Sequence, residues 1–152
     1  MSNDKNPNVW GKSGWFFMKS IASAYPSRPT IVEKENYKNF FNNIGNVLPC
    51  SLCSENWNRH LQINPLTETQ LFNNYQLFKW VNDQENLVKI LNNKDPVSYQ
   101  KSVEEFNNKY LNYNRDNLDN KTKFFYFVII LLIGILLFFI IWYFFGSKFD
   151  YV

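Results

Sequence analysis

Residues 124–145 form an uninterrupted apolar run that carries no charged side chain. A membrane-spanning helix needs about 20 predominantly apolar residues, and the core helix of a small soluble domain is rarely that long. Tyr126, Trp142 and Tyr143 lie near the two ends of the run, where aromatic residues gather at membrane interfaces. We therefore predict a transmembrane helix over residues 124–145, followed by a short tail over residues 146–152.

Basic residues flank this run unequally. Arg115, Lys121 and Lys123 precede it, whereas Lys148 follows it. Segments rich in Lys and Arg stay on the cytoplasmic side of a membrane. The distribution predicts a single-pass membrane protein, with the part before the run on the cytoplasmic side.

The part before the run is long enough for one small folded domain. Its apolar residues recur at helical spacing, and no stretch alternates as a strand would. We assign residues 1–9 to a disordered lead-in, residues 10–111 to a helical domain and residues 112–123 to a polar linker. Five helices are expected in the domain, carrying in chain order Trp15, Phe40, Trp57, Leu77 and Phe106.

Two local signals suggest where helices begin. Pro49 suits the first turn of the third helix, because its missing N–H is not needed there. Thr67 and Gln70 have the spacing of a capping box and predict the start of the fourth helix.

Charge and glycine spacing exclude several kinds of site. The net charge of +3 is mild and there is no basic run, so nucleic acid is not an expected partner. No glycines are spaced as in a dinucleotide-binding turn or a P-loop, so a nucleotide cofactor would need a helical scaffold. The glycines are Gly11, Gly14, Gly45, Gly134 and Gly146.

The chain contains two cysteines, Cys50 and Cys53, directly after Pro49. The C-x-x-C spacing lets both sulfurs meet across one helical turn. At a helix start, the backbone amides and the macrodipole favour a thiolate at Cys50 and raise its reactivity. We interpret the pair as redox-active.

Two simpler interpretations compete with a redox pair. A structural zinc site needs four ligands, and the chain adds only His60, which lies two turns further along the same helix. Two unrelated buried cysteines are the other alternative, since free Cys behaves as a small apolar residue. His60 itself is expected on the surface.

Glu85 interrupts the apolar stripe of the fourth helix, between Val81 and Val88. A buried carboxylate is costly unless it is paired. Either the edge of the stripe is solvated there, or the core holds something polar. We favour a solvated edge.

Several segments match one known family in order and spacing, over about residues 10–100. They are Gly11-Lys12, Trp15, Tyr25-Pro26, Pro29-Thr30, Pro49 through Cys53 and Trp80 through Asn86. These segments resemble the Erv/ALR family of FAD-linked sulfhydryl oxidases. Together with the membrane segment and the single C-x-x-C, the chain looks like the small thiol oxidases of large cytoplasmic DNA viruses. The resemblance implies a four-helix bundle plus a short fifth helix that holds FAD against the cysteine helix.

The resemblance also implies a reaction. Cys50, as the outer sulfur, would form a mixed disulfide with a substrate thiol, and Cys53, as the inner one, would attack the flavin and pass on two electrons. Oxygen would reoxidise the flavin and yield hydrogen peroxide. The implied partners are thiol-containing proteins, such as a small thioredoxin-like carrier, and pairing into homodimers is common in the family.

Ten positions match family contacts to FAD, with several departures. Lys19 and Glu85 stand where the family has histidines, and Lys89 replaces an asparagine. Lys12 replaces an arginine, which keeps the positive charge but loses the planar guanidinium group with its forked N–H donors. The implied cofactor-binding residues are Gly11, Lys12, Trp15, Lys19, Tyr25, Glu85, Asn86, Val88, Lys89 and Lys94.

Two other functions remain as alternatives to a thiol oxidase. One is a flavin-free dithiol exchanger, although thioredoxin-type motifs follow a strand and the pattern here is helical. The other is a non-catalytic, membrane-anchored structural protein on the same fold, because function depends on the site rather than on the fold.

Overall fold

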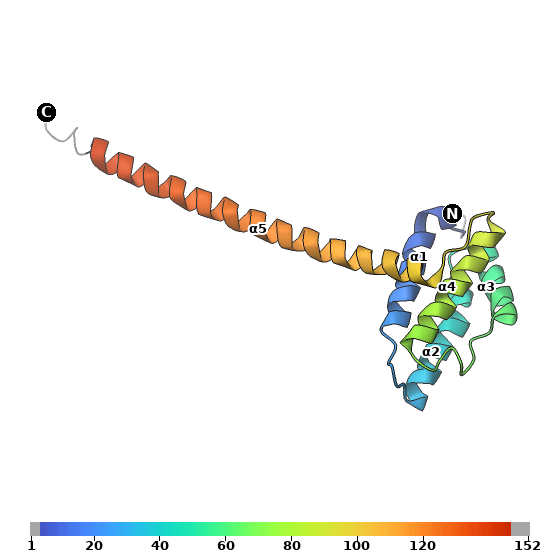
Figure 1. Cartoon of the computed structure of the whole chain (residues 1–152). Coiled ribbons are helices and arrows are strands. Elements are labelled where there is room, and N and C mark those ends of the chain that lie inside the picture. The colour runs from blue at the N-terminus through green and yellow to red at the C-terminus, as the bar shows by residue number, and fades with distance from the viewer. Residues whose placement is uncertain (1–3, 147–152) are drawn as a thin grey trace. The chain divides into compact units, whose positions relative to one another are not determined.

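The structure, a computed structural model, describes residues 4–146, without the side chains of residues 114, 116 and 144–146. The described part is all-helical and contains no strand, which confirms the predicted all-α class. Figure 1 shows the elements in chain order. They are α1 (Pro7–Ser23), α2 (Ile31–Asn43), the 3₁₀ turn η1 (Ile44–Val47), α3 (Ser51–Ile63), α4 (Asn74–Leu91) and α5 (Tyr99–Gly146).

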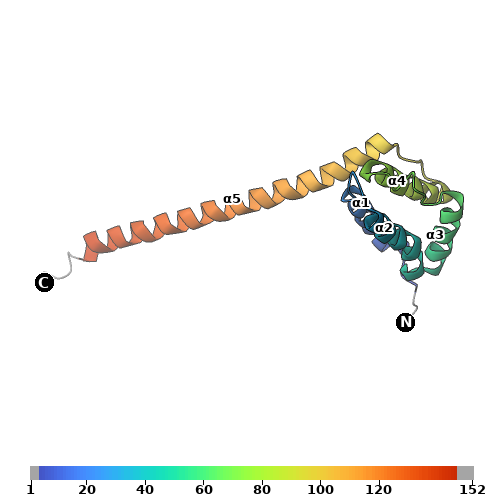
Figure 2. The ribbon, with the colours of Figure 1, turned by 90° about the horizontal axis from the view of Figure 1, so that it is seen from below.

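The chain divides into two compact units, Met1–Phe106 and Asn107–Val152. In the first unit, α1 packs against α4, and α3 packs against η1 and α4. Figure 2 shows α1 to α4 arranged around one shared interior. The first turns of α5 belong to this unit, because the Phe106 ring lies 5.4 Å from that of Phe16 on α1 and 5.3 Å from that of Phe78 on α4.

An aromatic cluster fixes α3 inside the first unit. The Trp80 ring lies 5.3 Å from Phe41 and 6.1 Å from Trp57, and both pairs meet nearly edge to face. The indole of Trp57 donates a hydrogen bond to the Phe41 carbonyl at 3.0 Å, and that of Trp80 donates one to the Asn64 carbonyl at 3.0 Å. Rings of this size bury much apolar surface, and the bonded N–H groups fix their orientation.

Helix α1 begins earlier than the sequence pattern predicted. The Asn6 side chain caps it by accepting the Asn8 N–H at 2.9 Å, and Pro7 occupies the first turn. Both residue types are favoured at these positions. The predicted disordered lead-in over residues 1–9 is therefore wrong for residues 7–9, while residues 1–3 lie outside the described part.

The predicted start of the fourth helix is also wrong. The Thr67 and Gln70 side chains form the expected local hydrogen bond at 2.5 Å, but α4 begins at Asn74, with Asn73 as its cap. Between them, the Leu71 carbonyl accepts a hydrogen bond from the Tyr25 hydroxyl at 2.9 Å, and Leu71 is fully buried. A tertiary contact thus holds this segment in a turn instead of a helix.

Helix α5 joins three segments that the sequence predicted to be separate. The short fifth helix, the linker over residues 112–123 and the apolar run over 124–145 form one helix, Tyr99–Gly146. The linker contains neither Gly nor Pro, and its Asp119 pairs with Lys123 at 2.6 Å, one turn apart. The predicted tail, including Lys148, lies outside the described residues except for Gly146.

The apolar part of α5 is exposed along its length in the second unit. Leu132, Leu136 and Phe139 are 58%, 61% and 64% exposed. By length and composition, this helix could cross a membrane.

Candidate active site

The two cysteines form a disulfide at the start of α3. The Cα atoms of Cys50 and Cys53 lie 5.2 Å apart, within the ordinary range for a disulfide. The predicted meeting of the two sulfurs across one turn is confirmed. The alternative of two unrelated cysteines does not hold.

Cys50 is the N-cap residue of α3 and has an extended backbone conformation. Its sulfur accepts a hydrogen bond from the Cys53 N–H at 3.2 Å. Pro49 precedes the cap, so the prediction that it occupies the first turn of this helix is wrong. The helix start therefore directs an amide at Sγ of Cys50, which favours a thiolate there when the disulfide is reduced.

The exposure of the two cysteines is the reverse of what the outer and inner assignments imply. Cys50 is only 8% exposed, whereas Cys53 is half-buried. The residues on both sides of Cys50 bind the N-terminal segment. The Asp4 carboxylate accepts hydrogen bonds from the Ser51 N–H at 2.9 Å and the Ser51 hydroxyl at 2.7 Å, and the Lys5 N–H donates to the Pro49 carbonyl at 2.7 Å.

The bonds to Asp4 also change its acidity. The Ser51 hydroxyl, and then the Ser51 backbone N–H, stabilise the carboxylate and hold the pKa of Asp4 below its ordinary value. Asp4 is therefore an anion at neutral pH, at the N-terminus of the helix that carries the disulfide.

Three of the predicted cofactor contacts meet in one ion-pair cluster. The Lys19 ammonium lies 2.5 Å from one Glu85 oxygen, and Lys89 lies 3.2 Å from the other. Lys19 also donates a hydrogen bond to the Ser102 hydroxyl at 2.7 Å. The Glu85 side chain is 15% exposed, so the preferred interpretation of a solvated stripe edge is wrong. The core holds a polar cluster there, and its two cations pair the carboxylate.

The two aromatic candidates have different surroundings. Trp15 is half-buried, and its ring lies 6.0 Å from that of Trp57 on the disulfide helix. Tyr25 is 2% exposed, and its hydroxyl is bonded to the Leu71 carbonyl. Burial, followed by the nearby carboxylates of Glu68 and Glu33, raises the pKa of Tyr25 to about 12. Tyr25 thus supports the fold as a neutral donor.

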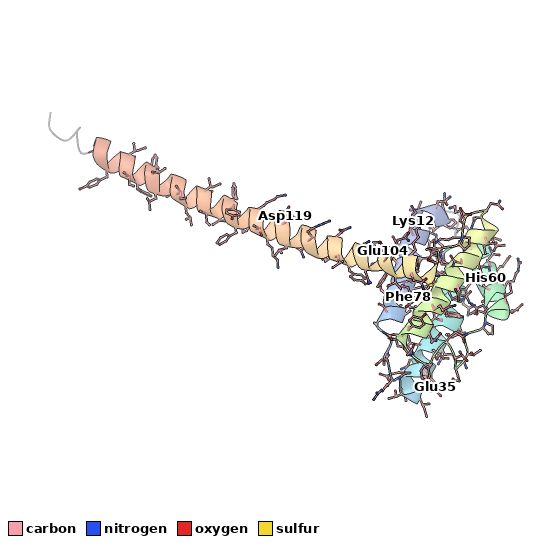
Figure 3. All side chains as sticks on the ribbon, viewed as in Figure 1. Lys12, Glu35, His60, Phe78, Glu104 and Asp119 are labelled. Carbon is pink, nitrogen blue, oxygen red and sulfur yellow. A yellow bond between two sulfur atoms is a disulfide. The ribbon has the colours of Figure 1, made fainter. Side chains whose placement is uncertain are left out.

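The remaining candidates lie on α4, on the connection to α5 and at the start of α1. The Asn86 amide donates to the Val97 carbonyl at 2.9 Å and accepts from the Val97 N–H at 2.8 Å, so it holds the α4–α5 connection in place. Val88 and Gly11 are half-buried. Lys12 and Lys94 are exposed, and Figure 3 labels Lys12 on α1.

His60 is a buried residue that was expected on the surface. It is 2% exposed, and its Nδ1 has no hydrogen-bond partner among the described residues. Burial, and then the charge of Arg59, lowers the pKa of His60. Its position three residues after the buried Trp57 is a sequence signal that could have placed it on the inner face.

Comparison with known proteins gives the same family as the sequence motifs. The Erv1 / Alr family model matches residues 12–111. A probable FAD-linked sulfhydryl oxidase of Acanthamoeba polyphaga mimivirus is 37% identical over 99 residues, which are 65% of this chain and 69% of the relative. The mitochondrial FAD-linked sulfhydryl oxidase of Saccharomyces cerevisiae is 28% identical over 78 residues, which are 51% of this chain and 40% of that protein.

The fold agrees with solved structures. The FAD-binding domain of Erv1 from Saccharomyces cerevisiae superposes with a TM-score of 0.57 at 24% identity, covering 62% of this chain and 87% of that domain. The yeast Erv1 core superposes with the same score over 77% of its length. Family model, viral relative and fold agree over the segment that carries the disulfide, and the chain belongs to the Erv1/Alr family.

Proposed function

We propose that this protein is an FAD-linked thiol oxidase that forms disulfide bonds in substrate proteins through Cys50 and Cys53. The observation that carries the proposal is the Cys50–Cys53 disulfide at the start of α3, within an Erv1/Alr fold. These two residues are the cysteines of this sequence, and in the proposed reaction the pair both accepts electrons from substrate and passes them on.

Several of the candidate residues suit FAD. The exposed Lys12 and Lys94 offer ammonium donors for a diphosphate, and the half-buried Trp15 ring, 6.0 Å from that of Trp57 on α3, offers an aromatic face. The buried Nδ1 of His60 is a polar atom without a partner among the described residues, as expected near a polar ligand. When bound, FAD supplies the acceptor for two electrons from the reduced cysteine pair.

The exchange with substrate is carried by the chain's own sulfurs. A substrate thiolate attacks Sγ of Cys50, the Cys50–Cys53 bond breaks, and its electron pair stays on Cys53 as a thiolate. A second substrate thiolate then attacks the mixed disulfide and releases Cys50, so the substrate gains a disulfide and the protein holds a dithiol. The Cys53 N–H, which already points at Sγ of Cys50, stabilises the thiolate that leaves.

We propose molecular oxygen as the final electron acceptor, with hydrogen peroxide as its product. Thiol-containing proteins are the substrates, and a small thioredoxin-like carrier fits a reaction that ends in disulfide exchange. A dithiol exchanger of the thioredoxin type is disfavoured, because its motif follows a strand and the described residues contain none.

The apolar part of α5 is proposed to anchor the protein in a membrane. It has the required length and exposes its apolar side chains. Arg115, Lys121 and Lys123 precede it, which supports a cytoplasmic position for the oxidase domain.

The test uses the full chain purified in detergent. The protein should be yellow and should consume oxygen with dithiothreitol. Cys53→Ser should keep the flavin but abolish its reduction, and Cys50→Ser should block protein thiols while sparing small ones. A colourless protein that consumes no oxygen would contradict the proposal, and flavin retained without turnover would indicate a non-catalytic member of the family.

A further inference from the structure

The segment Asp4–Asn6, called here the N-terminal strap, is bonded to the chain on both sides of Cys50. The Lys5 backbone N–H donates a hydrogen bond to the carbonyl of Pro49, the residue before Cys50. The Asp4 carboxylate accepts hydrogen bonds from the backbone N–H and the hydroxyl of Ser51, the residue after Cys50. At its other end the strap continues into α1, where the Lys5 carbonyl accepts the Trp10 indole N–H at 3.3 Å. The strap is therefore bonded directly to the two residues that flank Cys50 at the start of α3.

The attached strap conflicts with the access to Cys50 that the reaction requires. A substrate thiolate has to reach Sγ of Cys50 along the direction of the disulfide bond, yet Cys50 is only 8% exposed. Ser51, Asp4 and Lys5 are themselves exposed, so the strap lies at the surface, over the turn. Some part of the structure has to move before a protein thiol can attack.

The strap can move at lower cost than α3. Helix α3 is fixed by Trp57, which is 4% exposed, bonded to the Phe41 carbonyl and packed against Trp80. The strap is held on the turn by the bonds from Lys5 and Ser51 and buries no large side chain. Exposed segments with few buried contacts open with the smallest free energy.

The Asp4 carboxylate adds an electrostatic effect. It accepts the Ser51 N–H, which belongs to the helix start that would otherwise stabilise a thiolate at Cys50. A neighbouring anion disfavours a second negative charge. The attached strap therefore opposes the anionic exchange reaction at Cys50.

We propose that the N-terminal strap is a lid over Cys50, with Asp4 as its latch. The lid detaches from Pro49 and Ser51 when a protein substrate approaches. Asp4 is a positioning residue in this scheme, because it acts through the start of α3. The proposal rests on the proposed exchange at Cys50, in which a substrate sulfur bonds to Sγ of Cys50 and the electron pair of the broken bond goes to Cys53.

The first experiment measures reduction of the disulfide in the full chain, in detergent and without oxygen. The probes are dithiothreitol and reduced, unfolded ribonuclease, and the product is trapped with N-ethylmaleimide and counted by mass spectrometry. Asp4→Asn should speed reduction by the protein thiol about tenfold, the change expected when hydrogen bonds to a charged group are weakened. Reduction by dithiothreitol should change less, because the small thiol needs a smaller opening.

Matched variants separate the latch from a general charge effect. Glu35→Gln removes one negative charge from an exposed site on α2, labelled in Figure 3, and should leave both rates unchanged. Asp4→Glu keeps the charge and should stay closer to the original rate than Asp4→Asn. Ser51→Ala removes one of the two donors to Asp4 and should give an intermediate rate.

The second experiment measures a property that a purely structural role would not change. In a Cys53→Ser background, the pH profile of iodoacetamide alkylation reports the pKa of the Cys50 thiol. Adding Asp4→Asn should lower this pKa by about one unit, because a neighbouring anion is neutralised. Equal rates of disulfide reduction and equal pKa values of the Cys50 thiol in Asp4→Asn and Glu35→Gln would contradict the proposal of a lid. Without oxygen, bound flavin takes up at most one electron pair per protein, after which excess thiol leaves the cysteine pair reduced. Failure of the proposed oxidase would therefore be seen separately, as a colourless protein or as absent oxygen consumption.

Discussion

The Lys19 ammonium on α1 and the Glu85 carboxylate on α4 form an ion pair at 2.5 Å in the interior of the helical domain. Their side chains are 11% and 15% exposed. Ser102, in the first turns of α5, and Lys89, one turn along α4, complete the cluster.

Removing one member of this pair should destabilise the domain strongly. Lys19→Met leaves Glu85 with Lys89 alone and should lower the free energy of unfolding by about 3 kcal/mol, because a buried charge loses its closest partner. The double variant Lys19→Met with Glu85→Met should cost less than the sum of the two single variants. Chemical denaturation of the four proteins measures this coupling.

The exposed pair of Lys79 and Asp83 on α4 is the control for that cycle. Its atoms also approach closely, at 2.9 Å, but its side chains are 47% and 40% exposed. Lys79→Met should change the free energy of unfolding by less than about 1 kcal/mol. Equal effects at Lys19 and Lys79, or additive effects within the first pair, would contradict the assigned role of the cluster.

Gly45→Ala should disturb the helix that carries the disulfide. A Cβ at this position would lie 2.6 Å from Cδ1 of Trp57, and the Trp57 ring is held by its bond to the Phe41 carbonyl. Overpacking of this kind costs about 1–3 kcal/mol of stability. Thermal denaturation measures the loss. In Gly11→Ala a Cβ meets nothing within 4 Å, so stability should instead rise by up to about 1 kcal/mol. A loss of stability in both variants would contradict the specific clash with Trp57.

Stability should fall over the pH interval just below about 6.5 because of His60, the single histidine of the chain. Burial, and then Arg59, lowers the pKa of His60 in the folded protein. As the pH falls below the ordinary histidine value of 6.5, the unfolded chain takes up a proton that the folded protein does not. Stability is therefore complete above that value and is lost as the pH falls towards the lowered pKa.

Melting temperatures at several pH values test this dependence. His60→Gln should flatten the curve in that interval, whatever its effect on the melting temperature at neutral pH. The same pH dependence in His60→Gln and in the original chain would contradict the assignment.

Charged residues in the apolar part of α5 should release the protein from membranes. Leu132 and Leu136 are 58% and 61% exposed on the helix, and each change to Arg opposes insertion by about 2.5–3.5 kcal/mol. The double variant should appear in the soluble fraction after carbonate extraction. Leu118→Arg, on the same helix before the apolar run, should remain in the membrane pellet. Retention of both proteins in the pellet would contradict a spanning role for this segment.

Several features followed from the sequence alone because their causes are local. The disulfide needs only the spacing of Cys50 and Cys53, and the helical class needs only apolar residues at helical intervals. The length of residues 124–145 predicted an apolar helix in the same way, although the structure continues it back to Tyr99. Motif order predicted the family, which the family model confirms.

Tertiary contacts decided the rest. The pairing of Asp4 with Ser51 joins positions 47 residues apart, and that of Lys19 with Ser102 joins positions 83 apart. The Tyr25 hydroxyl donates a hydrogen bond to the Leu71 carbonyl, and this contact keeps the segment that begins at Thr67 in a turn instead of a helix. Local pattern cannot show which distant group will satisfy a buried or exposed polar atom, because that choice depends on how the helices pack. The sequence thus determined the cysteine pair and the helical class, and only the packed structure decided what binds beside Cys50 and what pairs Glu85.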